Sequence, residues 1–322
     1  MKLLTTIIDS MPANDYFYNQ QHRLNRMDKD TFFQKKHLLR IGRNYLNIDT
    51  PKIAGILNIT PDSFYDGGRY LDKDAVMNQV GKMISEGAGI IDVGAASSRP
   101  GAEEIGGNEE LERLARALGP IRETWPDVII SVDTTRADIA RKVVEKFQVN
   151  IINDISGGTA DPEMFDTLAE FQIPCIIMHM RGTPKTMQKN TDYSDLLKEL
   201  LEYFNHQTET LKQKGIHDII IDPGFGFSKT LEQNYQILYH LHVFSILSYP
   251  LMVGLSRKSM IYRKLNITPD KALNGTTALH MMALERGADI LRVHDVSEAK
   301  QTIELYINAR SEGNKYTHQH SE

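Results

Sequence analysis

The sequence predicts an α/β protein whose main domain is a (β/α)8 TIM barrel. Eight short apolar runs, rich in β-branched residues and nearly continuous, recur along the chain, as expected of parallel strands buried on both faces. Segments with helical patterning separate these runs. The repeat covers about 260 residues, close to the roughly 250 that are typical of this fold.

The eight runs are the predicted barrel strands. In chain order they read KIAGILN, GIIDVG, VIISVD, NIINDIS, PCIIMHM, DIIIDPG, PLMVGLS and DILRVHD. A doubly wound open sheet is the structural alternative, but that fold usually carries a Gly-rich dinucleotide-binding turn after its first strand. No such turn follows Asn58, so we favour the barrel.

The flanking segments suggest a simple domain division. The barrel domain is predicted over residues 36–310 and begins with a β-hairpin over residues 38–48 that turns at residues 42–44. Residues 1–35 are polar and have no clear apolar period, so we interpret them as an N-terminal extension that is partly disordered or helical. Residues 311–322 are interpreted as a disordered tail.

Composition excludes several classes of function. The 322 residues include 37 Lys and Arg against 42 Asp and Glu, a net charge of 37 − 42 = −5, unlike a generic nucleic-acid binder. The apolar run near the N-terminus is too short for a membrane span and lacks a signal-peptide pattern. The single cysteine, Cys175, forbids an intramolecular disulfide. These features predict a cytoplasmic protein with no membrane or nucleic-acid partner.

Every predicted strand ends on polar side chains. One such residue could be a turn residue or a helix N-cap. In a barrel, however, the carboxyl ends of all strands form one ring on the face where active sites lie. The sequence therefore predicts that these side chains converge on one cavity. They are Asn58, Asp92, Asp133, Asn153, His179, Asp222, the triplet Ser256-Arg257-Lys258, Arg292 and His294.

The predicted ring is chemically asymmetric. The strands in its first part supply mostly acceptors, whereas the last two supply the cations Lys258 and Arg292, where barrels commonly hold phosphate. A ligand with an N–H-rich ring at one end and an anion at the other would match both halves. A Mg²⁺ or Mn²⁺ site built by the aspartates is the alternative. That interpretation leaves both cations without a role. Long Gly- and Pro-rich loops after the first two strands are candidate lids.

Together these motifs resemble the dihydropteroate synthase family. The similar segments are GILNITPDSFYDGG, GAGIIDVGAASSRPGAEE, SVDT, IINDISGG, MHMRGTPKTMQ, IIIDPGFGFSKTLEQN, VGLSRKS and LRVHDV, in the family's order. The resemblance spans about residues 36–310 and implies a TIM barrel of folate biosynthesis. It implies a transferase that condenses 6-hydroxymethyl-7,8-dihydropterin pyrophosphate with p-aminobenzoate and releases pyrophosphate.

The resemblance also implies roles for particular residues. The pterin-binding residues would be Asp92, Asp133, Asn153, Met178, Asp222 and Lys258. The pyrophosphate would be held by Asn58, Arg292 and His294, with Asn58 also bound to Mg²⁺. The aminobenzoate would contact Ser98, Pro100, Phe227 and Ser259, the last at a helix start. The catalytic residues would be Lys258, Arg99 and Asp222.

Two departures and two alternatives stay open. Ser98 stands where the family carries a threonine, a mild change that keeps the hydroxyl and loses a methyl. Ala96 stands where the family carries a glutamate, which removes a carboxylate from the second loop but leaves Arg99 and Pro100 intact. The alternatives are a methyltetrahydrofolate-binding methyltransferase domain, with no pyrophosphate to bind, and a catalytically silent pterin-binding protein. Family members are commonly dimers, so the resemblance implies a homodimer.

Overall fold

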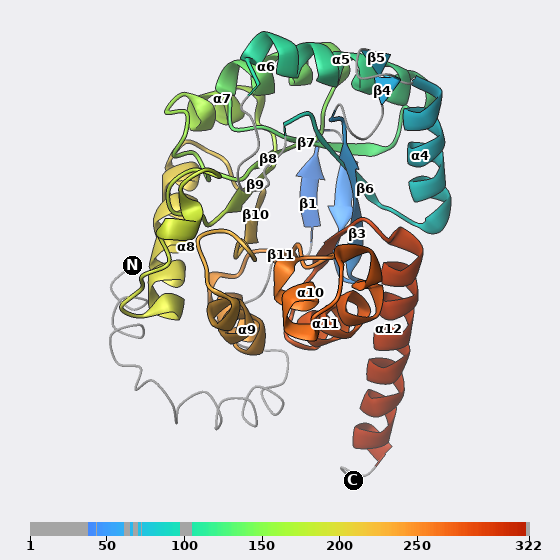
Figure 1. The fold of residues 1–322 in the computed structure, drawn as a ribbon, viewed down its shortest axis with the longest axis vertical. Coiled ribbons are helices and arrows are strands. Elements are labelled where there is room, and N and C mark those ends of the chain that lie inside the picture. Colours follow the sequence, from blue (N-terminus) through green and yellow to red (C-terminus); the bar gives the residue numbers. More distant parts are fainter. Residues whose placement is uncertain are drawn as a thin grey trace.

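The computed structural model describes residues 38–42, 44–60, 65–66, 70–71, 73–96 and 105–319. Eight parallel strands form one curved sheet with helices around its outside (Figure 1). Their order in the sheet is β10-β9-β8-β7-β6-β3-β12-β11. A parallel bridge between Ile221 and Leu251 connects the two ends of this order and closes the ring. The predicted (β/α)8 barrel is therefore confirmed.

Each barrel strand coincides with one predicted apolar run. The strands are β3 (Lys52–Asn58), β6 (Ile90–Gly94), β7 (Ile129–Asp133), β8 (Ile151–Asp154), β9 (Cys175–Met178), β10 (Ile219–Asp222), β11 (Met252–Val253) and β12 (Ile290–Val293). Helices cover the outer face of the barrel and side chains fill its interior, so these strands are buried on both faces.

The outer layer consists of nine α-helices within the described residues. They are α4 (Lys73–Glu86), α5 (Gly107–Thr124), α6 (Ala137–Phe147), α7 (Met164–Phe171), α8 (Leu196–Gln213), α9 (Leu231–Tyr239), α10 (Ser259–Leu265), α11 (Leu273–Glu285) and α12 (Val296–Gln319). Three 3-10 helices lie between them, η1 (Met187–Lys189), η2 (Leu241–Leu247) and η3 (Pro269–Lys271). In α6 the buried residues Ile139, Ala140 and Val143 recur at helical spacing, which gives the helix one apolar face for the barrel.

A β-hairpin closes the amino-terminal end of the barrel. Strands β1 (Leu38–Ile41) and β2 (Asn44–Asn47) pair antiparallel, as predicted. The side chains of Leu39, Ile41 and Leu46 are buried against the first residues of the barrel strands. A second short pair, β4 (Tyr65–Asp66) and β5 (Tyr70–Leu71), lies in the loop after β3. Because the hairpin closes the amino-terminal end, the carboxyl end of the barrel is the end available for a binding site.

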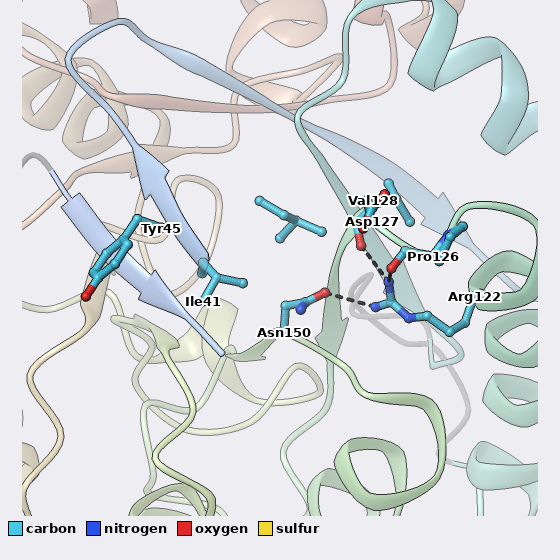
Figure 2. A pocket seen from close by; sticks show the side chains of 8 residues that line it. Ile41, Tyr45, Arg122, Pro126, Asp127, Val128 and Asn150 are labelled. Carbon is cyan, nitrogen blue, oxygen red and sulfur yellow. Dashed lines mark hydrogen bonds between the residues drawn. The ribbon is translucent and has the colours of Figure 1, made fainter. Parts of the chain in front are cut away.

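A cavity of about 440 Å³ lies beside the hairpin, near the starts of β7 and β8 (Figure 2). Its wall contains Arg122, which donates five hydrogen bonds to oxygen atoms of residues 126–128 and 147–150. These bonds use all five guanidinium donors, so Arg122 offers little to an anion. The arginine instead ties two loops together at the closed end of the barrel.

Residues 1–35, the predicted extension, lie outside the described residues. Helix α12 continues to Gln319, so the prediction of a disordered tail is wrong for residues 311–319. That segment contains no proline, and its single Gly313 costs a helix only about 1 kcal/mol relative to alanine. Within the described part of the chain, no helix is long and apolar enough to cross a membrane.

Candidate active site

Two aspartates and one arginine meet at the carboxyl end of the barrel. Arg292 on β12 donates from Nε to Asp92 Oδ2 on β6 at 2.6 Å and from Nη2 to Asp133 Oδ2 on β7 at 3.1 Å. Strand β3 lies between β12 and β6. The guanidinium of Arg292 therefore reaches Asp92 and Asp133 across the opening at the carboxyl end of the barrel, which we call the mouth. Burial raises the pKa of Asp133, while the charge of Arg292 opposes this change.

Asn153 extends this cluster onto the next strand. Its Nδ2 donates to Asp92 Oδ2 at 3.2 Å, and both side chains are almost fully buried. A buried amide and carboxylate need partners, because an unpaired polar group in the interior is costly. The hydrogen bonds among Asp92, Asn153 and Arg292 satisfy part of that need and leave a polar, preorganised surface facing the mouth.

Asp222 and Lys258 form a second part of the site. Asp222, the last residue of β10, accepts from the backbone N–H of Gly224 at 2.8 Å. Burial raises the pKa of Asp222, and the nearby charge of Lys258 opposes the rise. Burial likewise lowers the pKa of Lys258 to about 8, against the charge of Asp222. Such perturbed titrating groups in one mouth are typical of functional sites.

Lys258 also binds the loop between β10 and α9. Its Nζ donates to the carbonyl of Phe225 and lies 4.9 Å from the centroid of the Phe227 ring. A cation over an aromatic face is an attractive contact. Ser259 is the first residue of α10, directly after Lys258, as the sequence predicted. The structure thus places a cation, an aromatic ring and a helix start together.

The remaining predicted strand-end residues border the same mouth. Asn58 ends β3, and its Oδ1 lies 3.7 Å from the position that a β-carbon would take at Gly94. The side chain of Asp133 flanks the same glycine from the other side, with its Cβ 3.5 Å from that position. Met178 ends β9 and is buried. The exposed His294 follows β12, and its backbone N–H donates to Ser256 Oγ at 3.3 Å.

One predicted residue does not join this cluster. Arg257, part of the polar triplet before α10, instead forms a paired salt bridge with Asp295, through Nε at 2.9 Å and Nη2 at 2.8 Å. Ser98, Arg99 and Pro100 lie outside the described residues.

Arginines bind the chain on both sides of that second loop. Arg113 Nη1 donates to the carbonyl of Ala95 at 3.1 Å, and Arg136 Nη2 donates to that of Ile105 at 3.1 Å. Arg136 also pairs with the buried Glu110, at 3.2 Å. The two points where the loop joins the barrel are therefore held by charged side chains.

Sequence reasoning missed one buried residue at the edge of the site, Lys229. Its side chain is 3% exposed, and its Nζ lies within hydrogen-bonding distance of His179 Nδ1 at 3.1 Å. The only sequence signal is its place in a Gly-rich loop, directly before the helix cap Thr230. A lysine in that context reads as a solvent-exposed loop residue.

The acceptors and cations of the mouth suit an organic, anionic ligand. In the described part of the chain, no three His, Cys, Asp or Glu side chains group so that they could hold a metal ion. The mouth combines acidic and amide acceptors from β6, β7, β8 and β10 with the cations Lys258 and Arg292. This arrangement can bind N–H donors at one side and stabilise negative charge at the other.

Comparison with known proteins gives the same class of protein. Residues 54–294 match the family described as pterin binding enzyme. A dihydropteroate synthase of Synechocystis is 44% identical over 79% of this chain and 88% of its own length. That of Escherichia coli K12 is 41% identical over 82% and 95%.

Solved structures agree. The Yersinia pestis dihydropteroate synthase in a sulfonamide complex aligns with a TM-score of 0.80 and 37% identity, over 85% of this chain and 99% of that one. The chain therefore belongs to the pterin-binding enzyme family. Within that family it is a dihydropteroate synthase, a transferase of folate biosynthesis.

Proposed function

We propose that the mouth of the barrel binds 6-hydroxymethyl-7,8-dihydropterin pyrophosphate and p-aminobenzoate and joins them. The observation that carries the assignment is the cluster of Asp92, Asn153, Asp133 and Arg292 at one side of the mouth, with Asp222 and Lys258 beside it. Related proteins have been solved with ligands of this kind. One is the Xanthomonas albilineans synthase with 4-aminobenzoic acid, and another is the Clostridium difficile synthase in the presence of pteroic acid.

The pterin ring would lie against the acidic and amide side chains. Ionised Asp133 and Asp222 accept hydrogen bonds from ring N–H groups, and Asn153 can both donate and accept. Met178 supplies an apolar contact for the ring at the end of β9. Asp92 supports this set through its bonds to Asn153 and Arg292 rather than by exposure of its own carboxylate.

The aminobenzoate would lie beside Lys258 and Phe227, with Lys258 between it and the pterin. The Phe227 ring is already in contact with Lys258, and an aromatic substrate can extend that stack. Ser259 would receive the substrate carboxylate, with Ser98 and Pro100 completing the pocket. Arg99 belongs to the proposed catalytic set with Lys258 and Asp222.

The pyrophosphate would be held by Asn58, Arg292 and His294. Asn58 ends β3, Arg292 lies on β12 and His294 directly follows it, and these two strands are neighbours in the sheet. Asn58 offers an amide oxygen of the kind that Mg²⁺ accepts, and magnesium commonly uses one or two protein ligands together with substrate phosphates. The residues present therefore fit a magnesium ion held jointly with the substrate. When bound, the ion supplies positive charge to the phosphate oxygens.

The reaction itself needs little from the protein in proton transfer. The bond between the pterin methylene carbon and the pyrophosphate oxygen breaks, and the electron pair leaves with pyrophosphate. The electron-rich dihydropterin delocalises the resulting positive charge, and the aminobenzoate nitrogen attacks the methylene carbon and then loses a proton. Arg292 stabilises the departing charge, while Lys258 holds the two substrates in register.

One experiment separates this function from its alternatives. The protein is titrated with the dihydropterin pyrophosphate, with and without p-aminobenzoate, while binding heat and released pyrophosphate are measured. We expect pyrophosphate release that depends on aminobenzoate, with dihydropteroate as product. Binding without release would indicate a catalytically silent pterin-binding protein. Failure to bind the pyrophosphate end would favour a methyltetrahydrofolate-binding methyltransferase domain.

We also propose that the chain works as a cytoplasmic homodimer. Five exposed large apolar side chains, Tyr239, Leu265, Met282, Leu305 and Ile307, belong to α9, α10, α11 and α12. Helices α9, α10 and α11 contact one another, and α11 contacts α12. Apolar side chains gathered on adjacent helices are typical of a contact between subunits. Light scattering should give twice the monomer mass, and Leu305→Glu should shift the protein towards monomer.

A further inference from the structure

Lys229 is a buried cation without a carboxylate among its hydrogen-bonding partners. Four acceptors lie within hydrogen-bonding distance of its Nζ: His179 Nδ1 at 3.1 Å and the carbonyls of His179 at 3.3 Å, Gly224 at 3.1 Å and Phe227 at 3.0 Å. An ammonium group has three N–H donors, so all of them find acceptors here. Burial of a cation is unfavourable unless such partners compensate for lost water.

These acceptors lie on two different elements. Gly224 and Phe227 belong to the loop between β10 and α9, whereas His179 directly follows β9. The two elements are pressed together, because a β-carbon at Gly224 would lie only 2.2 Å from the His179 carbonyl oxygen. One ammonium group therefore fastens both ends of residues 224–227 to the end of β9.

The fastened loop carries the groups that meet Lys258. Phe225 offers its carbonyl to Lys258, and the Phe227 ring lies beside the same ammonium group. The loop has a second anchor, since Asn234 Oδ1 accepts from the Gly226 N–H at 2.6 Å. That anchor holds the middle of the loop, whereas Lys229 holds its ends.

We propose that Lys229 is a positioning residue for the second substrate. It holds Phe227 and the Phe225 carbonyl in the places that the aminobenzoate ring and Lys258 require, and it does not itself touch either substrate. This inference rests on the proposed location of aminobenzoate beside Phe227. The proposed pterin contacts on β6, β7 and β8 do not depend on this loop, and Asp222 meets it only through the Gly224 N–H. The effect of Lys229 should therefore be larger for aminobenzoate than for the pterin.

Protonation of Lys229 provides a second way to observe this role. Burial lowers the pKa of Lys229 to about 7; the charge of Asp222 opposes this shift, and those of Lys258 and Arg181 reinforce it. The adjacent His179 stays neutral, because burial lowers the pKa of its ring to about 2. As pH rises through 7, the amine keeps two N–H donors for four acceptors, so the loop loses a hydrogen bond and aminobenzoate affinity falls.

The test uses Lys229→Met, which keeps most of the side-chain volume and removes the donors. We expect the KM for p-aminobenzoate to rise tenfold or more, with kcat and the pterin pyrophosphate affinity within threefold of wild type. Lys146→Met, at an exposed position on α6, is the matched control and should leave both constants unchanged. Equal losses for both substrates, or no loss, would overturn the inference.

Phe227→Ala, measured in parallel, separates this inference from the substrate placement. If Phe227→Ala raises the aminobenzoate KM and Lys229→Met does not, the positioning role is wrong and the placement survives. If neither variant changes that KM, the placement is wrong and the inference falls with it.

The pH dependence of the wild-type enzyme gives a second test, read against folded Lys229→Met because burial also lowers the pKa of the neighbouring Lys258 to about 8. At saturating pterin pyrophosphate, its aminobenzoate KM should rise at least threefold between pH 6 and 8.5. In folded Lys229→Met that rise should be smaller. A wild-type KM that is flat with pH would contradict the proposed role.

Discussion

The two ends of the barrel are built from the same strands but contain opposite chemistry. At the amino-terminal end Ile90, Ile151, Ile220 and Ile290 pack under the hairpin. Two residues further along the same strands stand Asp92, Asn153, Asp222 and Arg292. Because side chains in a strand alternate between its two faces, each isoleucine and its polar partner point into the barrel, one layer apart.

The apolar layer at the closed end contributes mainly to stability, whereas the polar layer at the open end contributes mainly to function. The apolar layer is completed by the hairpin residues Leu39, Ile41 and Leu46, which exclude water from the closed end. At the open end, burial works against the charged forms and shifts the pKa values of Asp222 and Lys258. Changes at the closed end should therefore alter the free energy of unfolding, and changes at the open end should alter turnover.

The largest expected effect is on stability at the closed end. Leu39→Ala removes a fully buried side chain and should lower the free energy of unfolding by about 2–5 kcal/mol. Leu38→Ala is the matched control, since Leu38 is 50% exposed on the opposite face of the same strand and should change stability by less than about 0.5 kcal/mol. Denaturant titration measures both. A large loss of kcat in still-folded Leu39→Ala would contradict the assignment of stability to the closed end and turnover to the open end.

The second prediction concerns turnover at the open end. Lys258→Ala should lower kcat/KM by roughly a hundredfold or more, since losing a buried charged contact costs about 3 kcal/mol. Asp222 would also lose the cation that favours its ionised form. Lys52→Ala, at the amino-terminal end of β3, is the control and should stay within about twofold of wild type. Steady-state kinetics decides; a Lys258→Ala enzyme with more than a third of wild-type activity would refute the assignment.

The third prediction uses pH to examine Arg292. The charge of Arg292 lowers the pKa of Asp133, so Arg292→Ala should raise it and leave more of the carboxyl protonated at neutral pH. A protonated carboxyl is a poorer acceptor for pterin N–H groups. If the pKa rises by roughly one unit from about 7, we expect the variant to bind bare pterin about fivefold more weakly at pH 7, and the deficit to shrink as pH rises to 9.

Calorimetry of wild type and Arg292→Ala across this pH range makes the measurement. Arg292→Lys should recover only part of the affinity, because a point charge cannot reproduce the paired donors that reach Asp92 and Asp133. If the ratio of the pterin affinities of wild type and Arg292→Ala stays constant with pH, protonation of Asp133 does not explain the weaker binding.

The ends of the barrel strands were predictable from the sequence, because they depend only on the apolar run and on the polar residue that follows it. Continuous apolar runs that end on Asn58, Asp133 or Asp222 predict a buried strand, and the polar residue predicts where that strand reaches the mouth. The hairpin was predictable from two short strand-like runs separated by Gly42. Local patterns suffice for such features because they depend on neighbours in the chain.

Partnerships across the mouth were not predictable in this way. The sequence suggested only an anion contact for Arg292, whereas its guanidinium joins Asp92 and Asp133, 200 and 159 residues away. Lys229 was missed because three of its four acceptors are backbone carbonyls, which leave no trace in residue identity. Arg257 was placed in the ring, although it pairs with Asp295. The roles of Ser98, Arg99 and Pro100 stay predictions.

The smallest effect is expected from removal of residues 1–30. Every motif of the site begins after residue 50, and the first described residue, Leu38, belongs to the hairpin that closes the end of the barrel opposite the mouth. If function belongs to the open end, deletion should leave kcat/KM within about twofold and the free energy of unfolding within about 0.5 kcal/mol. Steady-state kinetics and denaturant titration on the truncated and full-length proteins provide the comparison. A loss of activity above about tenfold in folded truncated protein would mean that the extension shapes the mouth, and the assignment of separate roles to the two ends would then fail.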